Sequence, residues 1–110
     1  MTMIDWNRVG DLRSEIGDDS FVEVVEIFLE EADEVTNRML RLTTSAAQAQ
    51  ALHFLKGAAL NLGFEDLADL CQAGEHRAAR GVMIEPDPIL ACYQASKTAF
   101  LTSLQRPSAA

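Results

Sequence analysis

The chain has 110 residues, close to the usual size of one domain, so we expect residues 1–110 to form a single domain with one core. Hydrophobic residues make up 48% of the chain, but no apolar run approaches the roughly 20 residues of a membrane-spanning helix. Nine basic and seventeen acidic residues give a net charge of −8, which would repel a nucleic-acid backbone. We therefore expect neither a membrane nor a nucleic acid as partner.

Two helices are predicted in the first third of the chain, which holds eleven acidic and three basic residues in positions 1–40. Apolar residues recur at helical spacing from about Asp5 to Ile16, and Gly17 follows as a helix end. A second helix is expected to open at Asp18-Asp19-Ser20 and to run to about Arg41. Its glutamates lie off the apolar stripe, which indicates a solvated acidic face.

Three more helices are predicted in the rest of the chain. Ser45 with Gln48 three residues later fits a capping box, so a third helix should begin there and run to about Leu62. A fourth is expected over about residues 65–80, between the two glycines at positions 63 and 81. Asp87 followed by Pro88 fits an N-cap with proline at the first helical position, which predicts the start of a fifth.

The predicted fold is all-α, because no stretch shows the sustained polar and apolar alternation of strands. Four long helices with short connections favour an antiparallel up-down-up-down four-helix bundle, with the short N-terminal helix lying across one end. The tail Pro107–Ala110 is expected to be frayed. The opening residues lack the basic and apolar segments of a secretion signal, so the cytoplasm is the expected location.

His53 is the first candidate site residue, because it lies opposite the apolar stripe of its helix. At about 100° per residue, the stripe that should face the core contains Ala51, Leu55, Ala58 and Leu62. His53 should therefore point outward. The residues expected around it are mostly small, and a partner could approach them closely: Ala46, Ala49, Gln50, Lys56, Gly57 and Leu60.

Lys56 and Gly57 follow His53 within about one helical turn. A lysine three residues away is a surface neighbour, able to place an ammonium beside an anion carried by the imidazole. Glycine inside a helix costs about 1 kcal/mol relative to alanine, and access to the imidazole is a functional reason for Gly57. Each residue also has a plain interpretation, a generic surface charge for Lys56 and close helix packing for Gly57.

Glu75 is the third candidate, because it and His53 each lie eleven residues from Phe64 at the turn between two predicted antiparallel helices. Both should therefore reach similar heights along the helix pair. A carboxylate there could accept a hydrogen bond from one imidazole nitrogen and leave the other nitrogen free as a nucleophile. The plain alternative is a surface carboxylate near Arg77 and Arg80.

These residues resemble the histidine phosphotransfer domains of multistep two-component relays. The similarity runs through Leu52-His53-Phe54-Leu55-Lys56-Gly57-Ala58-Ala59 and continues through Asn61-Leu62-Gly63-Phe64 to Glu75. The resemblance implies that His53 carries the phosphoryl group, that Lys56 and Gly57 assist, and that Glu75 orients the ring. Many members have hydroxyl residues after the glycine, whereas this chain has Ala58 and Ala59.

The resemblance also implies the partners. Response-regulator receiver domains would exchange the phosphoryl group with His53, and a hybrid histidine kinase is a further candidate partner. Magnesium would be bound by the receiver rather than by this chain. The sequence shows no glycine-rich phosphate loop, so we do not expect the chain to phosphorylate itself from ATP. We also expect no bound cofactor. Whether such a carrier counts as an enzyme is a matter of convention.

Two other classes of function remain open. A helical interaction module could bind a signalling partner through the exposed Leu60 without phosphoryl transfer. The second class is a helical bundle that binds a metal or a cofactor. However, Cys71, Glu75 and His76 do not converge on the helical wheel as metal ligands should. Cys71 and Cys92 fall in apolar helical patterns, so we expect small core side chains there and no disulfide framework.

Overall fold

The computed structural model describes residues 3–105, and within this range it consists of helices without a strand. The all-α prediction is therefore confirmed. The predicted fraying of Pro107–Ala110 lies outside the described residues. The helices are α1 (Trp6–Ile16), α2 (Asp18–Met39), α3 (Ser45–Leu62), α4 (Glu65–Ala79) and α5 (Asp87–Gln105).

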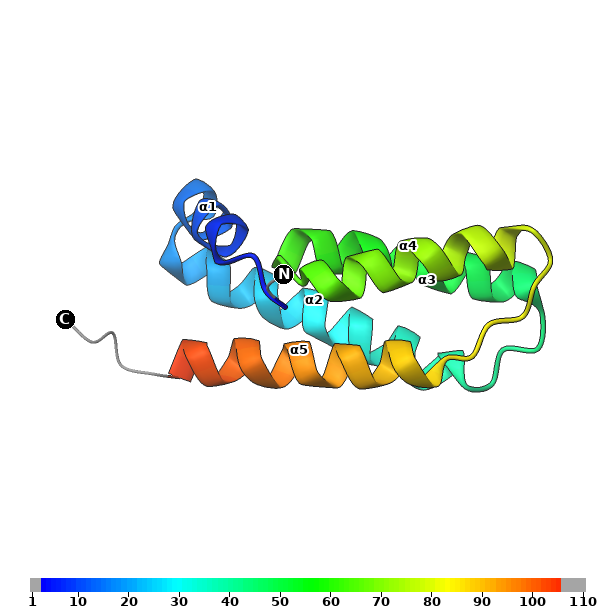
Figure 1. Ribbon diagram of the computed structural model, residues 1–110. Coiled ribbons are helices and arrows are strands. Elements are labelled where there is room, and N and C mark those ends of the chain that lie inside the picture. The colour runs from blue at the N-terminus through cyan, green and yellow to red at the C-terminus, as the bar shows by residue number, and fades with distance from the viewer. Residues whose placement is uncertain (1–2, 106–110) are drawn as a thin grey trace.

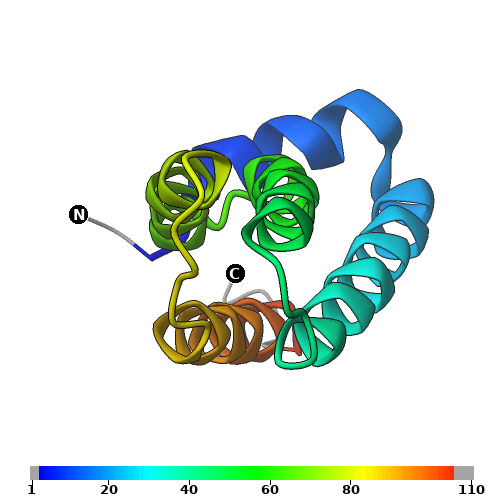
Figure 2. The same cartoon turned by 90° about the vertical axis from the view of Figure 1, so that its right-hand side faces the viewer.

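The four longer helices lie along one axis, and α1 crosses one end of them (Figure 1). Seen along this axis, α2, α3, α4 and α5 surround a shared interior (Figure 2). The connection between α3 and α4 is only Gly63 and Phe64, so these two helices run side by side in opposite directions. None of the helices within residues 3–105 is both long and apolar enough to span a membrane.

The α3–α4 turn is also where the N-terminal segment attaches. Gly63 adopts a left-handed backbone with φ of 76°, and a Cβ there would lie 2.8 Å from the carbonyl oxygen of Asp5. The amide of Asp5 donates to the Gly63 carbonyl at 2.7 Å, and the amide of Glu65 donates to the Met3 carbonyl at 3.0 Å. Glycine is therefore required at this turn both by conformation and by space.

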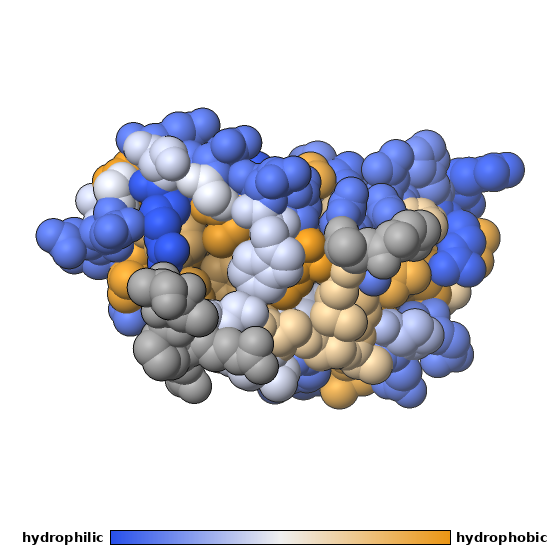
Figure 3. All heavy atoms as spheres, turned by 60° about the vertical axis from the view of Figure 1, so that its left-hand side comes forward, coloured by the Kyte–Doolittle hydropathy of each residue, from blue (hydrophilic) through white to orange (hydrophobic). Residues whose placement is uncertain are grey.

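Aromatic packing closes the same end of the bundle. Trp6 stacks on Phe100 of α5 with ring centroids 6.1 Å apart, and Phe100 meets the edge of Phe64 at 5.5 Å. Ile4 is buried, whereas Trp6 remains 46% exposed. Ile4 and Trp6 thus both take part in the packing at this end of the bundle. Figure 3 shows hydrophobic side chains across the middle of one face of the molecule, bordered by hydrophilic ones.

Two predicted N-caps are wrong, although α3 begins at Ser45 as expected. Thr44, not Ser45, is the N-cap of α3, and its hydroxyl accepts from the amide of Ala47 at 3.1 Å. Gln48 does not reach back to complete a capping box. Its side-chain amide is buried, donates to the carbonyl of Ile84 at 3.1 Å and accepts from the amide of Ile84 at 2.9 Å. The side chain of Gln48 thus bonds Ile84, which is distant in the sequence, instead of capping the start of its own helix.

The start of α5 is displaced by one residue for a similar reason. The carbonyl of Pro86 accepts from the amides of Ile89 and Leu90, both at 3.0 Å. The bond to Leu90 is the first helical one, so Asp87 already belongs to the first turn of α5 rather than preceding it. The negative charge of Asp87 still lies at the helix N-terminus, where the helix dipole favours it.

A polar cluster joins α2 to α5 across the bundle. The Asp33 carboxylate accepts from the Tyr93 hydroxyl at 2.6 Å and from the Lys97 ammonium at 2.8 Å. Tyr93 is fully buried, and its hydroxyl also lies 3.2 Å from the carbonyl of Leu29. The cluster thus satisfies the polar atoms that α5 brings into the interior.

Candidate functional site

His53 lies on the outer face of α3, and its side chain is 72% exposed. The prediction that the opposite stripe faces the core is confirmed, because Ala51, Leu55, Ala58 and Leu62 are all buried. The helix therefore fixes the direction of the imidazole through the burial of its other face. Nothing in the bundle covers most of the ring.

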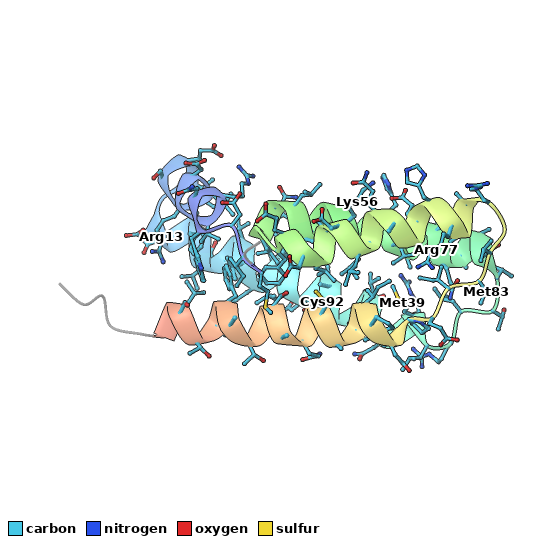
Figure 4. The ribbon with its side chains drawn as sticks, viewed as in Figure 1. Arg13, Met39, Lys56, Arg77, Met83 and Cys92 are labelled. Carbon is cyan, nitrogen blue, oxygen red and sulfur yellow. The ribbon has the colours of Figure 1, made fainter. Side chains whose placement is uncertain are left out.

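Glu75 of α4 meets His53 across the helix pair. The distance between Nδ1 of His53 and Oε2 of Glu75 is 2.9 Å. The other carboxylate oxygen, Oε1, accepts from Nζ of Lys56 at 2.8 Å. Figure 4 shows Lys56 on the side of the α3–α4 pair that faces away from α5. Glu75 is therefore not an isolated surface carboxylate, because its partners are His53 and Lys56.

The charge on Glu75 decides which imidazole nitrogen holds the hydrogen. The hydrogen bond from Lys56 lowers the pKa of Glu75 against the opposing effect of burial, and the bond with His53 lowers it further. An ionised carboxylate can only accept hydrogen bonds, so Nδ1 must be the donor. In the neutral ring, Nε2 then has a free lone pair and points away from Glu75.

Lys56 has a different position from the one that we expected. Its side chain is only 24% exposed and bonds the carboxylate, rather than lying free beside the imidazole. The lysine nevertheless remains one turn from His53 on the same helix, so its charge stays close to the ring. Lys56 thus acts first on Glu75, by holding one oxygen while the other meets the histidine.

The small residues predicted around His53 form an open surface. Ala46, Gln50 and Leu60 are exposed, with Leu60 at 57%, whereas Ala49 and Gly57 are half-buried. A Cβ added to Gly57 would meet no atom within 4 Å. Close helix packing therefore does not explain this glycine.

Phe54 is part of this surface, although the sequence did not single it out. Its side chain is 45% exposed and lines a shallow hollow beside His53, together with Ala49, Gln50 and Glu75. A second hollow on its other side extends to Glu34 and Arg38 of α2. The available signal was a large aromatic residue outside the buried stripe of α3.

Neither cysteine has a place in this chemistry. Cys71 is fully buried one turn before Glu75, and burial raises its pKa to about 12, so its thiol stays protonated. The thiols of Cys71 and Cys92 are both free.

Within residues 3–105, His, Cys, Asp and Glu side chains form no group of three that could hold a metal ion. His76 is exposed on α4 and lines a separate hollow together with Lys56 and Glu75.

Comparison with known proteins gives one result that bears on the family. Comparisons with curated proteins and with solved structures gave no significant match. The family model described as "Hpt domain" matches residues 23–104, which include α3, α4 and the His53, Lys56 and Glu75 side chains. This match covers well over half of the chain, so the chain belongs to the Hpt domain family.

Proposed function

We propose that this chain shuttles a phosphoryl group between the aspartates of receiver domains by carrying it on Nε2 of His53. Membership of the Hpt family implies histidine phosphotransfer in a phosphorelay at the level of the family. The observation that carries the assignment to His53 is its exposed imidazole, bound through Nδ1 to an ionised Glu75. The proposed scaffold is an up-down-up-down bundle of α2 to α5 with α1 across one end.

The transfer step needs no proton movement within this chain. The lone pair of Nε2 attacks the phosphorus of a receiver phosphoaspartate, the N–P bond forms, and the aspartate carboxylate leaves with the electrons of the broken P–O bond. The hydrogen on Nδ1 stays in its bond to Glu75. The positive charge that develops on the ring is offset by the Glu75 carboxylate 2.9 Å away. The reverse step loads a second receiver.

The surroundings of His53 support a protein as the donor. The hollow beside the imidazole is shallow, and its lining of Ala49, Gln50 and Phe54 offers no group that would bind a nucleotide phosphate. Gly57 leaves space for a docked surface. Magnesium belongs, in this proposal, to the receiver domain, and a hybrid histidine kinase is a further candidate donor through its own receiver domain.

The same proposal places the exchange in the cytoplasm. Cys71 and Cys92 are free thiols rather than a disulfide, as is usual where the environment is reducing. We do not assign the chain a kinase activity of its own.

Transfer of label from a phosphorylated receiver tests the proposal. A panel of receiver domains carrying ³²P-phosphoaspartate is incubated with the wild type, with His53→Gln and with His76→Gln. The wild type and His76→Gln are expected to gain acid-labile, base-stable label, and His53→Gln to gain none, because His76 is also exposed but makes no hydrogen bond to Glu75. Label retained on His53→Gln with unchanged helical content would overturn the assignment.

A further inference from the structure

Helices α3 and α4 approach each other closely just inside the site. Gly74 is buried on α4, and a Cβ added to it would lie only 3.1 Å from Cδ1 of Leu52 and 3.2 Å from Cδ1 of Ile84. Gly74 directly precedes Glu75 in the chain, and Leu52 directly precedes His53. A close contact between these helices thus lies next to the hydrogen bond between His53 and Glu75.

The other helical glycines have no such neighbours. A Cβ on Gly10 of α1 or on Gly57 of α3 would meet no atom within 4 Å. Glycine weakens a helix interior relative to alanine, because it has more conformational freedom to lose. At Gly74 this disadvantage is offset by close packing, since the absence of a side chain lets Leu52 and Ile84 occupy the space.

The two closest neighbours of a Cβ at Gly74 are both held to α3, whereas the third, Cδ1 of Ile89 on α5, lies at an ordinary 3.5 Å. Leu52 belongs to α3 and is fully buried. Ile84 lies in the α4–α5 connection, but its backbone amide and carbonyl are both bonded by the side chain of Gln48, one turn before Leu52 on α3. A methyl group on residue 74 would therefore press on two side-chain ends whose backbones are held to α3. We expect α4 to move outward by a few tenths of an ångström in response.

We propose that Gly74 is a positioning residue that sets the spacing between α3 and α4 at which Glu75 binds His53 and Lys56 together. Its carboxylate spans two donors on α3, with contacts of 2.9 and 2.8 Å. An outward shift of α4 would lengthen both contacts. The flexible Lys56 side chain can follow the carboxylate, but the imidazole turns about only two bonds, so the contact with His53 is the harder one to restore. The effect on phosphoryl transfer rests on the function proposed above, whereas the effect on the imidazole does not.

The test uses the full chain with Gly74→Ala, and Gly10→Ala as the matched control in an exposed helical position. Nitrogen NMR of His53 is expected to show one dominant neutral tautomer in the wild type and in Gly10→Ala, and a more mixed population in Gly74→Ala. Transfer from a phosphorylated receiver is expected to slow about three- to tenfold in Gly74→Ala, because small misplacements of reacting groups reduce rates strongly. Receiver binding should stay unchanged.

Rescue separates positioning from a general loss of stability. Leu52→Val and Ile84→Val each remove the Cδ1 atom that the new methyl group would meet. Adding both to Gly74→Ala is expected to restore the single tautomer and the transfer rate, and this triple variant also serves if Gly74→Ala alone does not fold. An unchanged His53 tautomer in Gly74→Ala, or mixed tautomers that persist in the folded triple variant, would overturn the proposal. Absence of label on the wild type would instead count against the proposed function, and the NMR result would still decide the role of Gly74.

Discussion

The Glu75 carboxylate holds two donors of different kinds with its two oxygens. Oε1 accepts from the Lys56 ammonium, and Oε2 accepts from an imidazole nitrogen. The bond from Lys56 lowers the pKa of Glu75, which keeps the carboxylate ionised and restricts it to accepting hydrogen bonds. Lys56 therefore selects the tautomer of His53 indirectly, through the charge on Glu75.

Substitution of Glu75 should separate charge from hydrogen bonding. Glu75→Gln keeps an oxygen acceptor for Nδ1 but loses the charge, whereas Glu75→Ala loses both. We expect transfer to slow several-fold in the glutamine variant and roughly ten- to a hundredfold in the alanine variant. Stopped-flow or quenched transfer assays with one phosphorylated receiver would measure this order.

The control for both variants is the affinity for the receiver, which should change little because Glu75 is mostly covered by its neighbours. Nitrogen NMR should also show mixed His53 tautomers in Glu75→Ala. Equal transfer rates in the wild type and the alanine variant would return Glu75 to the role of a surface charge.

The contact between His53 and Glu75 could be predicted from the sequence, because equal spacing from Phe64 sets equal heights on two antiparallel helices. The partner of Lys56 could not, since the rotamer of a long side chain depends on which acceptor the neighbouring helix offers. Phe54 was missed for another reason. An aromatic residue in a helix can turn toward the core or toward the solvent. Here the buried stripe of α3 already fills the core, so Phe54 stays at the surface.

At the scale of helices, the apolar periodicity predicted the existence and approximate bounds of all five elements. The errors concern caps. Ser45 with Gln48 has the pattern of a capping box, but the side chain of Gln48 binds Ile84, which lies 36 residues away. A local pattern carries no information about such a partner. The burial of Gln48 likewise appears only when the α4–α5 connection folds over the start of α3.

The exposed edge of α3 gives a prediction about docking. Gly57→Leu should leave thermal unfolding nearly unchanged, because nothing lies within 4 Å of the added Cβ. Transfer from a receiver should slow at least tenfold, since a docked partner would meet the new side chain next to His53. Circular dichroism and transfer assays measure the two effects. As a control, Gly10→Leu places the same volume in an equally open position on α1. Equal transfer by Gly57→Leu and the wild type would mean that no partner approaches this edge.

At the scale of the whole molecule, the stability of the fold should depend on the charge of Asp33 at the contact between α2 and α5. Burial raises the pKa of Asp33, but the hydrogen bonds from Lys97 and Tyr93 and the charge of Lys97 lower it more, so the net shift is downward. A carboxylate with a lowered folded pKa stabilises the fold fully above its unfolded pKa and loses this contribution as the pH falls through the folded pKa. The pKa of Glu75 is also lowered, so its contribution to the stability of the fold is likewise lost as the pH falls.

We therefore expect the free energy of unfolding to fall as the pH is lowered below about 5, and to fall less steeply in Asp33→Asn than in the wild type. Urea titrations at a series of pH values would measure the slope. Asp69→Asn is the matched control, because Asp69 is exposed on α4. Parallel slopes in the wild type and Asp33→Asn would show that the cluster does not contribute to the pH dependence.

All three polar groups of the site come from one helical hairpin, and this has a consequence for local unfolding. His53 and Glu75 are 22 residues apart, whereas the Asp33 contacts that tie down α5 span 60 residues or more. Openings that release α1 or α5 break long-range contacts, but they leave the short turn of Gly63 and Phe64 intact. Amide hydrogen exchange should then show the interiors of α3 and α4 as the slowest to exchange, with α1 and α5 faster. The reverse order would mean that the site is assembled only when the whole bundle closes.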